Sequence, residues 1–209
     1  FLAIKGPEKI TFSLANQPAY TGETQLIGDF NKYNILAAGT FARAIGISDE
    51  VIRGAVKKFK GVQGRMEEVV GAPFRIIVDY AHTPDSLEAV YQAFPGQRKI
   101  AVLGGTGGGR DKWKRPVMGA LAEKYCEQIF FTDEDPYDEN PETIVAEVAA
   151  GVKNKNKYQI IMNRREAIVA ALKTAKTNDV VLITGKGTDP YIMRANGTKE
   201  PWSDFKVTE

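Results

Sequence analysis

From residue 74 onward, apolar runs of strand length alternate with segments whose apolar residues recur every three or four positions. The runs are rich in β-branched and aromatic residues, which predicts strands over residues 74–80, 99–105, 128–132, 158–162 and 179–185. The intervening spacing predicts helices that begin at 84, span 116–126, begin at 141 and run from 164 to about 176. Such alternation predicts an α/β domain with a mostly parallel sheet and helices on both faces.

Polar residues mark the starts of several of these helices. Thr83 precedes Pro84 and Asn140 precedes Pro141, as expected for an N-cap followed by proline at the first helical position. Asn163 is followed three residues later by a glutamate, a spacing that resembles a capping box. These signals support the predicted helix boundaries.

The chain before residue 64 has a different pattern. It predicts short strands at 11–14 and 23–28, a helix at 34–46 and a second helix after Ser48. Residues 1–46 are too few to bury a core of their own. We therefore predict residues 1–63 to be the tail of a preceding domain with linker helices, and residues 64–209 to be a complete domain.

Composition narrows the class of protein. The 209 residues carry a net charge of +2, which gives no general electrostatic case for nucleic acid or an anionic membrane. One cysteine and one histidine exclude a disulfide framework and a multi-histidine metal site. No apolar run approaches the ~18 residues of a membrane span. We expect a cytoplasmic monomer without membrane insertion. The start at Phe1, without methionine, predicts a fragment of a longer protein.

Unusual polar residues or glycines follow each predicted strand. Ligands of open parallel sheets bind outside the carboxyl ends of the strands, so these segments are expected to meet at one edge. The segments are Asp79-Tyr80-Ala81-His82, GGTGGGRDKWKR (104–115), TDEDPYDENP (132–141), Asn163-Arg164-Arg165 and GKGTD (185–189). Their convergence predicts a ligand site at the carboxyl edge of the sheet.

Each segment has a functional and a purely structural interpretation. The glycine loop can form an anion-binding nest, and Arg110 offers a fork to a carboxylate, or the segment is a flexible loop with a solvated basic end. It matches neither the G-x-x-x-x-G-K-[ST] loop nor a dinucleotide fingerprint. The acidic segment is either a pocket for an ammonium group or a polar loop that caps a helix. GKGTD is either a close approach to a ligand or a turn.

Three single residues are interpreted by their type and position. His82 is either structural or close to a ligand. Trp113 is expected to be a packing residue, and Cys126 a buried and unreactive thiol.

These strings together resemble the Mur ligase family of ATP-dependent amide-forming enzymes of peptidoglycan synthesis, in particular the branch that adds the third amino acid. The resemblance covers nearly the whole chain. Its motifs are GDFNKYNILAA (28–38), GRMEEV (64–69), VDYAHTPDSLEAV (78–90), GGTGGGRDKWKRPVMG (104–119) and GKGTD. It implies a Rossmann-like C-terminal domain preceded by the tail of the central ATPase domain.

The resemblance also implies the chemistry and the site residues. ATP phosphorylates the carboxylate of a UDP-muramoyl dipeptide, and the amine of a free amino acid attacks the acyl phosphate. The residues that match the family's ATP contacts are Asn31, Asn34, Arg65, Asp79 and His82. Those that match its amino-acid contacts are Arg110, Asp135, Tyr137, Gly185 and Asp189. No catalytic residue within the chain is assigned.

The sequence departs from the family pattern in two of these motifs. Members that add diaminopimelate carry D-N-P-R, whose arginine pairs with the distal carboxylate, whereas this chain carries Glu134-Asp135-Pro136-Tyr137. A tyrosine cannot form that two-pronged ion pair. The family's G-K-G-H-E is replaced by GKGTD. These exchanges favour a lysine-like amine, with diaminopimelate as the alternative.

The family's phosphate-binding loop, magnesium ligands and UDP-binding domain are expected upstream of this chain. We therefore predict that the chain alone neither hydrolyses ATP nor forms an amide, although ATP and Mg²⁺ serve the longer protein. Three alternatives stay open: a ligand-binding module without activity, a Mur-like ligase for a different acceptor or amine, and a nucleotide- or S-adenosylmethionine-binding enzyme. The last requires an acidic residue at the end of the second strand, where Leu103-Gly104 supplies none.

Overall fold

The computed structural model describes residues 10–16 and 18–209, so Phe1 lies outside the described part. The chain divides into two compact units, residues 1–60 and 61–209. The observed division falls three residues before the predicted boundary at 63/64. The assignment of the first unit to the tail of an ATPase domain stays a prediction.

The first unit is helical where it is described. Its elements are the short 3₁₀ helices η1 (Leu14–Asn16) and η2 (Ala19–Gly22) and the α-helices α1 (Phe30–Ala44) and α2 (Asp49–Lys58). Ile35 of α1 and Ile52 of α2 form a small buried cluster. The prediction of strands at 11–14 and 23–28 is wrong. A strand needs a partner for its backbone groups, and neither segment pairs with a described strand.

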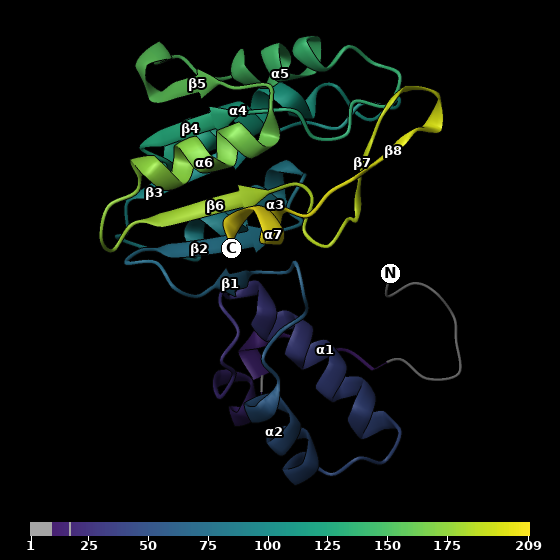
Figure 1. The fold of residues 1–209 in the computed structure, drawn as a ribbon. Helices are drawn as coiled ribbons and strands as arrows, with labels where there is room; N and C mark the ends of the chain where they lie inside the picture. The colour runs from purple at the N-terminus through teal and green to yellow at the C-terminus, as the bar shows by residue number, and fades with distance from the viewer. Residues whose placement is uncertain (1–9, 17) are drawn as a thin grey trace. The chain divides into compact units, whose positions relative to one another are not determined.

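The second unit is built on a sheet that has six strands within the described residues. The strand order is β1-β2-β6-β3-β4-β5 (Figure 1). The strands are β1 (Glu67–Val69), β2 (Arg75–Asp79), β3 (Lys99–Leu103), β4 (Gln128–Phe131), β5 (Tyr158–Ile160) and β6 (Val180–Thr184). β2, β6, β3, β4 and β5 are parallel, and β1 pairs antiparallel with β2. The predicted α/β sheet is confirmed, whereas β1 was missed because three residues carry too little pattern.

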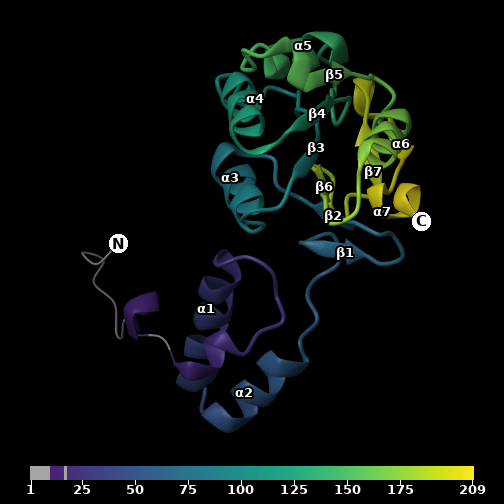
Figure 2. The same ribbon diagram turned by 90° about the vertical axis from the view of Figure 1, so that its left-hand side faces the viewer.

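Helices cover both faces of the sheet. α3 (Pro84–Gln92), α4 (Lys114–Tyr125) and α5 (Pro141–Ala149) lie on one face, and α6 (Arg164–Thr174) and α7 (Asp204–Thr208) on the other (Figure 2). The N-caps at Thr83, Asn140 and Asn163 are confirmed, because each side chain accepts a backbone N–H of the first turn. α4 begins two residues before the predicted position 116.

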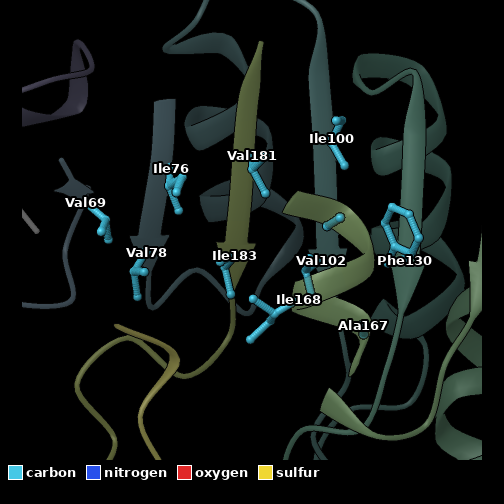
Figure 3. Close-up of a cluster of buried hydrophobic side chains, with 11 residues drawn as sticks. Val69, Ile76, Val78, Ile100, Val102, Phe130, Ala167, Ile168, Val181 and Ile183 are labelled. Carbon is cyan, nitrogen blue, oxygen red and sulfur yellow. The ribbon is translucent and has the colours of Figure 1, made fainter. Parts of the chain in front are cut away.

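The core between the sheet and α6 consists mainly of aliphatic side chains of the strands and the helix, together with the aromatic ring of Phe130 (Figure 3). Val181 and Ile183 of β6 and Ile100 and Val102 of β3 are completely buried there, together with Ile168 of α6. A parallel sheet covered on both faces buries both sides of its strands. The predicted continuous apolar strands are thereby explained.

Four elements follow residue 189 and were not predicted. β7 (Tyr191–Met193) and β8 (Lys199–Pro201) form an antiparallel hairpin, joined by the short η4 (Ala195–Gly197), beyond the carboxyl ends of the parallel strands (Figure 1). α7 is held by a buried ion pair in which the Arg164 guanidinium donates to both carboxylate oxygens of Asp204 at 2.8 and 2.7 Å. A further 3₁₀ turn, η3 (Lys155–Lys157), precedes β5.

Candidate functional site

The loops that follow β3, β4 and β6 meet at the carboxyl edge of the sheet. Gly107 N of the first loop donates to Asp135 O of the second at 2.8 Å. Lys186 Nζ of the third loop donates to both carboxylate oxygens of Asp135 at 2.8 and 2.7 Å. The predicted convergence of the glycine loop, the acidic loop and GKGTD is therefore confirmed.

Glu134 lies at the centre of these loops and is 1% exposed. Thr106 Oγ1 donates to its Oε1 at 2.9 Å, whereas its Oε2 is buried without a hydrogen-bond partner among the described residues. A Cβ on Gly104 or Gly185 would lie less than 3.0 Å from this side chain, so both positions require glycine. Burial raises the pKa of the Glu134 carboxyl above its ordinary value, because desolvation disfavours the charged form.

Lys186 joins two carboxylates of the site. Its ammonium group is fully buried, bonds Asp135 and also lies 3.3 Å from Asp189 Oδ2. Met193 N of the β7–β8 hairpin donates to Asp135 at 2.8 Å as well. Asp135 is thus neutralised inside the protein, whereas the Asp189 side chain stays 43% exposed. An incoming ammonium group would meet Asp189 before Asp135.

The glycine loop packs closely against the acidic loop. A Cβ on Gly107 would lie less than 3.0 Å from Pro136 O, and one on Gly108 would meet the Tyr137 ring at 2.9 Å. Tyr137 adopts a left-handed conformation with φ of 52°. Arg110 follows this loop and is exposed, and no ion-pair partner exists for it among the residues that the structure describes. Its guanidinium is available to a carboxylate.

Arg115 joins the glycine loop to the acidic loop through hydrogen bonds of its buried side chain. Its side chain is fully buried and donates to Thr106 O at 3.0 Å, to Glu139 Oε2 at 3.0 Å and to Glu147 Oε2 at 2.6 Å. It thereby ties the glycine loop to the acidic loop and to α5. Nothing in the sequence pattern set this arginine apart from its charged neighbours.

A second group of predicted residues gathers after β2. The buried Asp79 carboxylate accepts Met66 N and Ala81 N, each at 2.7 Å. Burial raises the pKa of Asp79, although these two hydrogen bonds act in the opposite direction. The Arg65 guanidinium lies over the Tyr80 ring at 4.3 Å from its centroid, and His82 Nδ1 is 2.9 Å from Tyr80 O. Arg65, Asp79 and His82 therefore form one cluster.

Asn31 and Asn34 belong to the first unit and lie in the first turns of α1. Asn31 Nδ2 donates to Ile27 O at 2.7 Å, and Asn34 Nδ2 donates to Asn31 Oδ1 at 3.0 Å. Asn34 is exposed. Their predicted role toward ATP stays a prediction.

Several residues of the site were not predicted from the sequence. Glu134 and Lys186 were missed, although alternation along an extended segment places Glu134 opposite Asp133 and Asp135. Arg194 was also missed; it pairs with Asp133 and, at 2.7 Å, with Glu200, and so ties the hairpin to the acidic loop. The prediction that Trp113 is a packing residue is wrong, because its side chain is 67% exposed.

No group of three or more His, Cys, Asp and Glu side chains within residues 10–16 and 18–209 could hold a metal ion. In the same residues, no helix is both long and apolar enough to cross a bilayer.

A mostly parallel sheet covered on both faces, with polar loops meeting at its carboxyl edge, defines a Rossmann-like α/β domain. A family model described as "Mur ligase, glutamate ligase domain" matches residues 64–187 of this domain. The chain belongs to this family, as the sequence motifs predicted.

Curated relatives agree with this assignment. Proteins named UDP-N-acetylmuramoyl-L-alanyl-D-glutamate–2,6-diaminopimelate ligase match from Aquifex aeolicus, at 42% identity over 91% of this chain and 39% of the relative, and from Bacillus licheniformis, at 43% identity over 97% of this chain and 42% of the relative. The chain thus spans about two fifths of the length of these relatives.

Solved structures show the same fold. A structure described as such a 2,6-diaminopimelate ligase superposes with a TM-score of 0.66 at 32% identity, covering 88% of this chain and 38% of the other. A pseudomurein peptide ligase type C from Methanothermus fervidus superposes with a TM-score of 0.64 at 24% identity, covering 78% of this chain and 34% of the other. The second likeness concerns the fold alone.

Proposed function

We propose that this chain is the amino-acid-presenting domain, with part of the ATPase domain, of a cytoplasmic ligase that adds an amino acid to UDP-N-acetylmuramoyl-dipeptide. The observation that carries the proposal is the joining of three loops at one sheet edge around Glu134, with Asp189 partly exposed on GKGTD and Arg110 exposed after the glycine loop. Asp189 can bind an ammonium group and Arg110 can bind a carboxylate, so together they suit the two charged ends of an amino acid. The names of the relatives support the same reaction.

ATP fits the cluster after β2. Each Asp79 oxygen accepts one N–H, so the carboxylate keeps acceptor capacity for ribose hydroxyl groups. Arg65 lies over the ring of the neighbouring Tyr80, and the His82 ring contacts the same ring in a T-shaped arrangement. When bound, ATP would supply the phosphoryl group that activates the acceptor carboxylate. We place the phosphate-binding loop and the Mg²⁺ ligands outside this chain.

The incoming amine is either lysine-like or diaminopimelate. Tyr137 stands where the family's arginine would pair with a distal carboxylate, and the nearby Arg194 is already engaged by Asp133 and Glu200. These contacts favour a plain ammonium group at the distal end, whereas the names of the relatives favour diaminopimelate.

Calorimetry with L-lysine and meso-diaminopimelate distinguishes the two amines. We expect L-lysine to bind more tightly, and Tyr137→Arg to shift the preference toward diaminopimelate by about tenfold, since a guanidinium can pair with the added carboxylate. Tyr137→Phe is the control, because it keeps the ring without adding a cation. Tighter binding of diaminopimelate by the unaltered chain would overturn the lysine-like assignment.

A turnover assay tests the ligase itself. A longer protein that includes this chain should form the amide from UDP-N-acetylmuramoyl-dipeptide, ATP and the amino acid, whereas the 209-residue chain should not. Amide formation by the 209-residue chain would refute our division of the activity. An inactive longer protein that still binds the amino acid would instead indicate a ligand-binding module.

A further inference from the structure

The segment 64–66, through which the chain enters the sheet, packs backbone against backbone on the GKGTD loop. Gly64 is buried with φ of 62°, and a Cβ on it would lie less than 3.0 Å from Thr188 N and from the Gly187 carbonyl carbon. Gly187 has φ of 49°, and a Cβ on it would lie 2.7 Å from Gly64 O. Neither residue can carry a side chain unless the two backbones separate.

The same segment is bonded to the loop after β2. Met66 has a left-handed φ of 49° and donates its N–H to Asp79 Oδ2 at 2.7 Å. Asp79 O in turn accepts Gly185 N, the first residue of GKGTD, at 3.1 Å. A Cβ on Gly187 would also lie 2.8 Å from the Tyr80 Cβ. Segments 64–66, 79–81 and 185–188 are therefore locked together.

The left-handed backbone conformation of Met66 shows that the surrounding contacts hold this segment in place. A non-glycine residue with positive φ is uncommon and persists where the surrounding contacts determine it. Here the Asp79 carboxylate holds the Met66 N–H, and the side chain of Met66 is buried. The path of this segment is thus fixed by the loop after β2 on one side and by GKGTD on the other.

We propose that segment 64–66 is a positioning element of the amino-acid site, which sets the place of GKGTD and couples it to the Asp79 loop. The proposal rests on the proposed function, because it takes Asp189 and Gly185 as amino-acid contacts and Asp79 as a nucleotide contact. Dense packing transmits a displacement of Gly64 directly to Gly187. Because coupling between sites is reciprocal, nucleotide at Asp79 and amino acid at Asp189 should change each other's affinity.

Hydrogen exchange on the 209-residue chain tests the contact without any ligand. Gly64→Ala should speed exchange of the amides of residues 185–189 by about tenfold, since the new methyl group forces the backbones apart. Gly96→Ala is the matched control: its φ of 73° imposes the same left-handed strain, but nothing lies within 4 Å of its Cβ position. Equal exchange of residues 185–189 in the two variants would overturn the proposal.

A second variant covers the case in which Gly64→Ala does not fold. Asp79→Asn preserves the shape of the side chain but can accept only one of the two N–H groups through its single carbonyl oxygen. We expect faster exchange both at Met66 and in residues 185–189. Faster exchange at Met66 alone would show that the segments are not coupled and would overturn the proposal.

Kinetics of the longer protein separate positioning from a merely structural role. Gly64→Ala should raise the KM for the amino acid about tenfold while kcat changes less than about twofold, because the chemistry is retained once the amino acid is bound. Gly96→Ala should change neither. If Gly64→Ala lowers kcat alone, the positioning role is refuted. If the longer protein forms no amide at all, the proposed function fails, whereas the exchange experiment still decides the contact.

Discussion

At the scale of single residues, the carboxyl edge of the sheet holds charges that the protein has largely satisfied internally. Asp135 is paired with Lys186, and Asp133 with Arg194. Glu134 differs, because one oxygen of its carboxyl has no partner among the described residues. A buried polar atom without a partner costs about 1–3 kcal/mol and points to a function when it persists. Most carboxylates of the acidic loop therefore stabilise the fold through ion pairs, and Glu134 is an exception.

The pH dependence of stability should reveal the state of Glu134. Its pKa is raised by burial, so the folded protein holds this proton at pH values where the unfolded chain has lost it. Its contribution to stability is therefore complete below the ordinary glutamate pKa and is lost as pH rises toward the raised folded pKa. Glu134→Gln should remove this loss and raise the free energy of unfolding at pH 7 by about 1 kcal/mol.

Urea unfolding between pH 4 and pH 8 provides the measurement. Glu142→Gln, at the exposed start of α5, is the control and should leave the slope of stability against pH unchanged. An identical slope for the unaltered chain and Glu134→Gln would show that Glu134 is ionised at neutral pH.

At the scale of elements, the sheet edge is shaped by how closely the helices and loops approach one another. α4 and α5 cross at glycines: a Cβ on Gly119 would lie less than 3.0 Å from Val148 O, and one on Gly151 would meet Pro116 O. This contact determines the position of α5. It thereby also determines the position of Glu147, which accepts a hydrogen bond from the Arg115 guanidinium that joins the two loops. Gly119 lies inside α4, where glycine is otherwise unfavourable, so close packing accounts for glycine at this position.

Two glycines in helices should respond oppositely to the same substitution. Gly119→Ala should lower the free energy of unfolding by about 2 kcal/mol, because α4 and α5 must move apart. Gly54→Ala in α2 meets nothing within 4 Å, so the gain in helix propensity should raise the helicity and the stability of the first unit by about 1 kcal/mol.

Thermal unfolding followed by circular dichroism measures both effects. A stabilising Gly119→Ala would mean that α4 and α5 do not need the close approach seen here.

At the scale of the whole molecule, the second unit buries a continuous core with its one cysteine inside. Cys126 is 2% exposed, and burial raises the pKa of its thiol to about 12. Since the thiolate is the reactive species, the folded unit should protect it. The prediction of a buried, unreactive thiol is confirmed as far as burial is concerned.

Thiol labelling therefore reports on the folding of the second unit. At pH 8 and without denaturant, an aromatic disulfide reagent should label Cys126 at least about a hundredfold more slowly than the unfolded chain. The labelling midpoint in urea should coincide with the loss of near-ultraviolet dichroism. Rapid labelling of the native protein would show that α4 and the start of β4 open locally.

The sequence by itself determined the alternation of elements, the helix caps, the family and the edge where the site lies. These follow from local patterns: apolar runs, N-cap side chains at Thr83 and Asn140, and motif order along the chain. The elements it missed were short ones such as β1 and β7, whose three residues each carry too little pattern. The strands wrongly expected before residue 29 failed because strand formation depends on a pairing partner, which a local pattern does not reveal.

Only the tertiary structure decided which charged side chains are neutralised by ion pairs within the protein and which stay available to bind a ligand. Asp135 looks like a binding group in the sequence, yet it is paired with Lys186, 51 residues further along the chain, and Asp133 is paired with Arg194, 61 residues further along. Glu134 and the Gly64–Gly187 contact carry no local signal, because their importance lies in what surrounds them in space. A sequence pattern records the periodicity of burial along one element, whereas neutralisation and close approach depend on the geometry between elements.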